Sequence, residues 1–236
     1  MSNNPSSSDR TSRVAPKKQT MEDLEQQVQV ALESDAAAIS ERVRAATLQA
    51  LSGGELNKET IKAVMDAVVK GVQQGAARHG NQAQALKQAM RGLDEALASA
   101  AEATQLTLQE AGSRGEAFSR QTLKQATDDL AVLEALFIET LGNAAKGANG
   151  IARATLQDIV EHGRTSGTAV GGRIESALSQ LARTLANTAH EQLGAGTQVV
   201  RQEASLLAGL AAGVLRGMAD RLHTVSTETK ENTDEG

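Results

Sequence analysis

Four histidines and the carboxylates near them are the side chains in this sequence that could bind a metal or move protons. A di-iron helical bundle needs two Glu-x-x-His units and two further glutamates on facing helices. Only His223 follows a carboxylate at that spacing, Asp220, and no second unit matches it. Asp158 and His162 are four residues apart, which is the spacing of an ordinary solvated pair on one helix face. The spacing therefore predicts no metal site.

Motifs for nucleophilic catalysis and phosphate binding are also absent from the sequence. The chain has no cysteine, which excludes a thiol nucleophile, a thiolate zinc site and a disulfide. The segment GVQQGAARHG (71–80) has spaced glycines but lacks the Lys-Ser/Thr ending of a P-loop. No nucleophile elbow is present. We therefore predict a protein that is not an enzyme and that binds no cofactor.

The amino-acid composition predicts that the chain is built from helices. No proline follows Pro16, there is no tryptophan or tyrosine, and Phe118 and Phe137 are the two phenylalanines. Proline interrupts helices, aromatic residues favour strands, and the abundant alanine has the highest helix propensity. The predicted fold class is all-α, either an elongated antiparallel helical bundle or a chain of long amphipathic helices.

Composition also divides the chain into a body and two tails. Residues 1–19 are rich in serine and carry four basic side chains, so they predict a basic disordered tail. Residues 20–227 form the predicted helical body, with a weak joint near the glycines of 142–150. Residues 228–236 predict a short acidic disordered tail.

Charge and hydropathy limit the classes of partner and the cellular location that we expect. The net charge of −5 and the lack of stacking aromatics argue against nucleic acid. A membrane span needs about 20 apolar residues, whereas the nearest candidate, Ala204 to Leu215, is stopped by Arg216. The N-terminal residues lack the apolar core of a secretory signal. We expect a cytoplasmic protein, at most peripheral on granules or a membrane, with secretion as an alternative.

Cap and stop signals predict the first helix. Thr20 indicates a start and Ser52-Gly53-Gly54 a stop, which predicts one helix over 21–51. Its inward positions repeat every eleven residues, at about 3.67 residues per turn. These positions are Leu24, Val28, Leu32, Asp35, Ile39, Val43, Ala46 and Ala50.

The remaining helices are predicted in the same way. Asn57 and Asn81 indicate two further starts, and Gly112 the end of the second of these helices. The stretch LAVLEALFIETL (130–141) is the most apolar and predicts the anchor of the core. Three more helices are expected beyond the joint, the first of them ending near Glu161.

Glycine at every fourth position is the most unusual pattern in the sequence. Each such glycine costs about 1 kcal/mol inside a helix, so a compensating contact is expected. Four-residue spacing places the glycines on one face, where a second helix can approach closely, either within the bundle or from a partner. The runs are Gly71 and Gly75; Gly163, Gly167 and Gly171; and Gly209, Gly213 and Gly217.

The last of these runs adjoins leucine and valine side chains in the final predicted helix. A smooth apolar face of this kind suits a partner helix, and it is the one candidate interaction face that the sequence predicts. Its members are Ser205, Leu206, Gly209, Leu210, Gly213, Val214 and Gly217.

The whole predicted body, from Thr20 to about Glu228, resembles the phasin-like, alanine-rich helical proteins that coat bacterial polyester storage granules. It is also similar to other uncharacterised bacterial helical proteins of this composition. The resemblance implies amphipathic helices that lay their apolar stripes on a hydrophobic surface and turn charged residues to water. It implies no individual functional residue.

The patterns favour a non-enzymatic interaction or scaffold protein whose alanine, leucine and valine stripes pair helix with helix. Its expected partners are a second copy of itself or another helical protein. A phasin-like coat on a hydrophobic granule or lipid surface is one alternative. A secreted effector or translocator is the other, because an aromatic-poor, cysteine-free body with a polar N-terminal segment is compatible with export.

Overall fold

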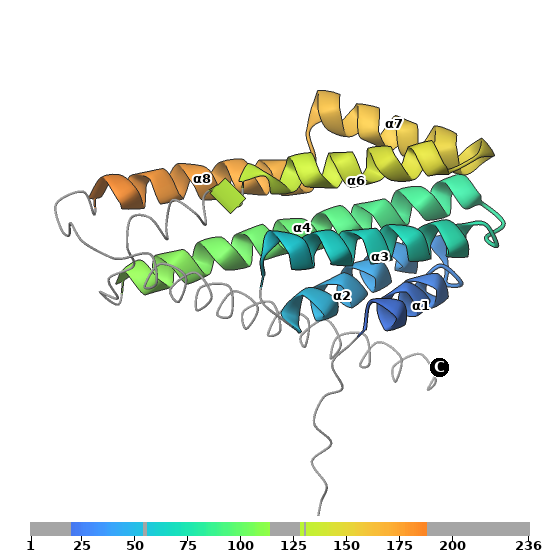
Figure 1. The fold of residues 1–236 in the computed structure, drawn as a ribbon, viewed down its shortest axis with the longest axis horizontal. Coiled ribbons are helices and arrows are strands. Elements are labelled where there is room, and N and C mark those ends of the chain that lie inside the picture. Colours follow the sequence, from blue (N-terminus) through green and yellow to red (C-terminus); the bar gives the residue numbers. More distant parts are fainter. Residues whose placement is uncertain (1–19, 54–55, 114–127, 130, 188–236) are drawn as a thin grey trace, which may run out of the picture.

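The computed structural model describes residues 20–53, 56–113, 128–129 and 131–187. Over these ranges the chain is helical and contains no strand, which confirms the all-α fold class (Figure 1). The predicted tails, 1–19 and 228–236, lie outside the described residues. The helices are α1 (Met21–Ala31), α2 (Ala36–Ser52), α3 (Lys58–Ala76), α4 (Gln82–Ser113), α6 (Leu133–Gly147), α7 (Gly150–Ser166) and α8 (Ala169–Asn187).

The first four helices run alternately in opposite directions, and their closest neighbours are not the adjacent ones in the chain (Figure 1). α1 packs mainly on α3 and α2 mainly on α4. The Lys70 ammonium lies 2.8 Å from the Glu25 carboxylate, and Arg78 donates to the Gln29 side chain at 2.7 Å. Because both contacts advance in the same order along the two helices, α1 and α3 lie parallel.

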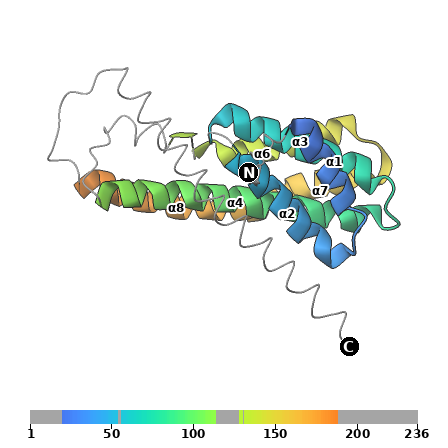
Figure 2. The same cartoon turned by 90° about the horizontal axis from the view of Figure 1, so that it is seen from below.

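The later helices extend this bundle. α6 and α7 form a hairpin, and α8 runs along the C-terminal half of α4. Figure 2 shows α4 and α8 continuing side by side past the ends of the other described helices. Arg173 of α8 lies 3.6 Å from Glu102 of α4, and Gln105 and Gln109 both donate to the side-chain oxygen of Gln180. Hydrogen bonds and an ion pair between polar side chains therefore join α4 and α8 at several points along their length.

The predicted helix starts are confirmed by their caps. The Thr20 hydroxyl accepts the Asp23 N–H at 3.1 Å, and the Asp23 carboxylate accepts the Thr20 N–H at 3.0 Å. This reciprocal pair is a capping box. The side-chain oxygens of Asn57 and Asn81 each accept the N–H three residues later, at 2.8 and 3.2 Å. α2 ends at Ser52, as its glycine-rich stop predicted.

The prediction of one continuous helix over 21–51 is wrong, because the chain turns between Ala31 and Ala36. Asp35, the only charged member of the predicted stripe, is exposed and immediately precedes α2. A carboxylate is costly to bury without a partner, so the stripe is interrupted at this residue. The break allows α1 and α2 to pack on different helices.

The core is centred on α4, which packs against α2, α3, α7 and α8. The stretch 130–141 was predicted to anchor the core, and several of its large side chains are buried, although Val132 is 37% exposed. Most of the fully buried large side chains come from α1 to α4 and the turn after α1, and one of them, Leu141, belongs to this stretch. On α4 these are Leu86, Met90, Leu93 and Leu97; on α6 the buried residues include Leu133, Leu136, Phe137 and Leu141.

The predicted joint at 142–150 is narrower in the structure. α6 continues through Gly142 to Gly147, and α7 begins at Gly150, which has a positive φ of 54°. α7 then runs to Ser166, beyond the predicted end at Glu161. All three glycines in this region thus belong to helices, Gly147 as the last residue of α6 and Gly150 as the first of α7, and the turn itself occupies 148–149.

Candidate functional site

Gly71 and Gly75, the first run of spaced glycines, lie where α3 packs closely on α1. A Cβ added at Gly71 would meet the Val28 Cβ at 3.1 Å, and one added at Gly75 would lie 3.2 Å from the Leu32 Cβ. Both glycines are buried. The intramolecular interpretation is therefore right for this pair, since it brings α3 against α1.

A third buried glycine, Gly92 on α4, has the same role against α2. An added Cβ would overlap the Ser40 carbonyl oxygen and lie 3.0 Å from its carbon and 3.2 Å from the Arg44 backbone nitrogen. These neighbours are backbone atoms, which cannot rotate away as a side chain can. Gly92 has no glycine four residues away, so the four-residue spacing that marks the other glycines does not mark it.

The interpretation of Gly163, Gly167 and Gly171 as one helix face is wrong. α7 ends at Ser166, and Gly167 follows it with a φ of 79°, a left-handed conformation that favours glycine. Gly171 belongs to α8. The polar residues between these glycines favour a turn here, so the regular spacing spans a helix junction.

The candidate interaction face of the final predicted helix lies outside the described residues. The same holds for Asp220 and His223, so the structure bears on neither group. Asp158 and His162 are described, and both are exposed. The Asp158 carboxylate lies 2.9 Å from the Lys87 ammonium of α4, and this hydrogen bond lowers the pKa of Asp158.

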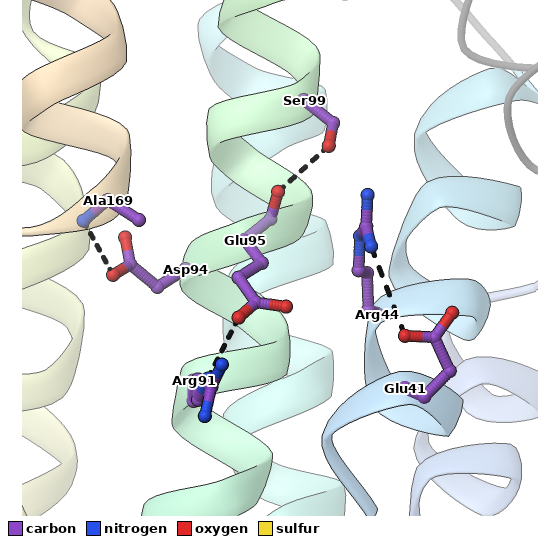
Figure 3. A network of polar contacts seen from close by, with 7 residues as sticks. All are labelled: Glu41, Arg44, Arg91, Asp94, Glu95, Ser99 and Ala169. Carbon is purple, nitrogen blue, oxygen red and sulfur yellow. Dashed lines mark hydrogen bonds and ion pairs between the residues drawn. The ribbon is translucent and has the colours of Figure 1, made fainter.

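The most organised polar cluster surrounds the start of α8. Asp94 of α4 accepts the backbone N–H of Ala169 at 2.8 Å and that of Val170 at 2.9 Å. In Figure 3 the Asp94 side chain points to Ala169 on one side of α4, while Arg44 and Glu41 of α2 lie on the other side. A carboxylate at a helix N-terminus satisfies backbone donors and complements the helix dipole.

A second carboxylate reaches the same turn from α6. Glu134 accepts the Thr168 hydroxyl proton at 2.7 Å, and the Thr168 hydroxyl oxygen accepts the Gly171 N–H at 2.9 Å. A Cβ on Gly171 would overlap the Glu134 carboxylate, so the absence of a side chain makes room for it. We call Asp94, Glu134, Thr168 and Gly171 the α8 junction.

The pKa of Asp94 reflects both burial and hydrogen bonding at the α8 junction. Burial raises the pKa of Asp94, its two backbone hydrogen bonds oppose that rise, and the nearby Glu134 charge adds to it. Both carboxylates already have donors within the chain. In the segments that the structure describes, no group of three or more histidine, aspartate or glutamate side chains could hold a metal ion.

Replacing Asp94 with alanine is expected to lower the free energy of unfolding by about 1–2 kcal/mol, because Ala169 and Val170 lose their acceptor. Urea denaturation followed by circular dichroism would measure the loss.

Because the folded pKa of Asp94 is raised, the folded state holds its proton to higher pH than the unfolded state does. The stability advantage of the wild type over Asp94→Asn should therefore shrink as pH rises from about 4. A constant difference across that range would contradict this assignment.

An open groove of about 630 Å³ lies along the outer face of α6 and ends at the C-terminal turn of α7. Its lining combines small residues with side chains of both charges. Gly163 of α7 lies close to Ile138 of α6 in this lining, since an added Cβ would lie 2.7 Å from the Ile138 Cδ1. Ile138 is the one large apolar side chain among its lining residues, whereas small-molecule pockets are lined mostly by hydrophobic and aromatic side chains.

Comparisons with known proteins place the chain in a family without assigning an activity. No curated protein and no solved structure matches it. Among the helices that the structure describes, none is long and apolar enough to cross a membrane. One family model covers most of the sequence, matching residues 15–224. The chain therefore belongs to DUF6781, a family of unknown function.

Proposed function

We propose that this protein is a non-enzymatic helical scaffold that associates with other helices, either in a second copy of itself or in another helical protein. The observation that carries the proposal is the use of the apolar stripes inside the chain. Leu24 and Val28 of α1, Ile39 and Val43 of α2, and Leu93 of α4 are all fully buried. Stripes that are buried against one another are not available to coat a surface.

The close helix contacts support the same conclusion. Gly71, Gly75 and Gly92 each remove a side chain where a second backbone passes within the chain. Such contacts position helices relative to each other, and they would have no role in helices spread on an interface. A bundle of this kind presents its polar outer faces as a fixed arrangement, which is what a scaffold needs.

Circular dichroism during a thermal melt, with and without hydrophobic nanoparticles, tests the proposal. A scaffold that folds alone should show high helicity and a cooperative transition that particles do not move. The phasin-like alternative predicts the opposite result, with shallow melting and helicity that rises when particles are added. Particle-induced helicity would contradict the scaffold proposal.

The predicted interaction face in the final helix has its own test. Gly213→Leu should weaken association without loss of helicity if a partner helix approaches the face of Gly209, Gly213 and Gly217. Sedimentation equilibrium would measure self-association, and circular dichroism would measure helicity. Unchanged self-association in this variant would remove this face as the site of self-association.

A further inference from the structure

One face of α6 is directed out of the bundle and forms much of the groove described above. It carries Ala135, Glu139, Gly142, Asn143 and Lys146, and all five line the groove. Gly142 is half-buried and the other four are exposed. Their spacing of three and four residues places them on one side of the helix. We call these five residues the α6 seam.

Gly142 lacks the close contact that explains Gly71, Gly75 and Gly92. Gly147 and Gly172 also face open space, but they lie at the last residue of α6 and in the first turn of α8, whereas Gly142 lies inside its helix. A Cβ added there would meet nothing within 4 Å, whereas one added at Gly71 or Gly92 would strike another helix. A glycine inside a helix costs about 1 kcal/mol relative to alanine. Within the described chain nothing offsets this cost, so a close approach from outside is the remaining structural reason for glycine at this position.

The two charged residues of the seam are without an ion pair in the described chain. Lys146 reaches only the side-chain oxygen of Asn143, at 3.4 Å. Glu139 is near Lys62 of α3, but the Lys62 ammonium is bonded to Asp66 at 2.7 Å. An acid and a base are thus exposed on the same face, seven residues apart, with Gly142 and Asn143 midway between them.

We propose that the α6 seam binds the same seam of a second copy, with the two α6 helices antiparallel about a twofold axis at Gly142 and Asn143. This deepens the scaffold function proposed above and rests on it. In an isologous contact, if one residue of the first copy contacts a second residue of the other copy, the same pair also meets with the copies exchanged. Each Glu139 then lies opposite Lys146 of the other copy, which forms two equivalent ion pairs, and Gly142 lets the helices approach.

The charge pattern favours a copy of this chain over an unrelated helix. A seam with an acid at one side of its midpoint and a base at the other is complementary to itself in the antiparallel direction. A standard stable interface buries about 800 Å² on each partner, and one helix pair buries less. The dimer is therefore weak and reversible, and it forms at high protein concentration.

A single cysteine tests the position of the axis, because the natural chain contains none. In Asn143→Cys the two thiols would lie on either side of the twofold axis, within reach of a disulfide. Mild oxidation should convert most of this variant to a covalent dimer on a non-reducing gel. Arg153→Cys is the matched control, since Arg153 is exposed on α7 and outside the groove, and it should remain largely monomeric.

Charge reversal tests the partners across the interface. Glu139→Lys and Lys146→Glu should each weaken the dimer by about tenfold or more, and the double variant should restore it, because its ion pairs re-form in the opposite sense. Sedimentation equilibrium would measure the dissociation constants, and circular dichroism would verify folding. Glu161→Lys and Arg153→Glu make the same charge changes elsewhere on the surface and should leave the dissociation constant unchanged.

Several results would contradict the proposal that the α6 seam forms a dimer contact. A wild-type protein that stays monomeric at millimolar concentration contradicts it, as does a dimer that neither single charge reversal weakens. Failure of the double variant to restore affinity contradicts the antiparallel register. Self-association that depends on Gly213 and not on the seam overturns this inference but leaves the scaffold function standing. Helicity that appears only on hydrophobic particles overturns the scaffold function itself.

Discussion

Replacing Gly92 with alanine is expected to lower the free energy of unfolding by about 2–3 kcal/mol. The new Cβ would overlap the Ser40 carbonyl oxygen, and the backbone of α2 would have to move away from α4. The higher helix propensity of alanine offsets only part of this cost. Urea denaturation monitored by circular dichroism would give the change in the unfolding midpoint.

Gly142→Ala is the matched control for Gly92→Ala, because it makes the same chemical change in another helix. Its Cβ enters open space, so it should raise the free energy of unfolding by up to about 1 kcal/mol. Measurements at low protein concentration would keep any dimer out of the comparison. Equal effects of the two substitutions would show that α2 and α4 are not in backbone contact at Gly92.

Leu93→Ala is expected to destabilise the protein by about 3–5 kcal/mol, because it leaves a cavity among fully buried side chains. Leu93 is fully buried on α4, which packs against α2, α3, α7 and α8. Leu133→Ala should cost less, about 2–3 kcal/mol, because Leu133 lies at the first residue of α6. Thermal and urea denaturation of both variants would rank the two sites.

Leu106→Ala is the surface control on the same helix as Leu93. Its side chain is 42% exposed, so the substitution should change stability by about 0.5 kcal/mol or less. If Leu133→Ala destabilised the protein more than Leu93→Ala, the stretch 130–141 would be the main part of the core, as its apolar sequence predicts.

Local signals predicted the local structure well. Thr20, Asn57 and Asn81 cap the helices that their side chains predicted, because a cap depends on atoms within three residues. Continuity was predicted less well. The stripe through Asp35 is periodic, but α1 ends at Ala31 and α2 begins only after Asp35, the one charged member of the stripe.

Long-range contacts were beyond the sequence patterns. Nothing around Asp94 indicates that it accepts N–H groups at Ala169 and Val170, because the partner lies 75 and 76 residues later. Gly92 looks like a lone glycine in a helix, and only the path of α2 explains it. Evenly spaced glycines misled in the opposite way, since the spacing from Gly163 to Gly171 crosses a turn.

The parallel pairing of α1 with α3 and of α2 with α4 also constrains the order in which the chain can fold. The contacts of Glu25 with Lys70 and of Gln29 with Arg78 join residues 45 and 49 positions apart. Contacts at such separations slow folding relative to a bundle built from neighbouring helices. During synthesis α1 must wait for α3, and α2 for α4, so the N-terminal third of the chain reaches its native packing only when about half of the protein has been made.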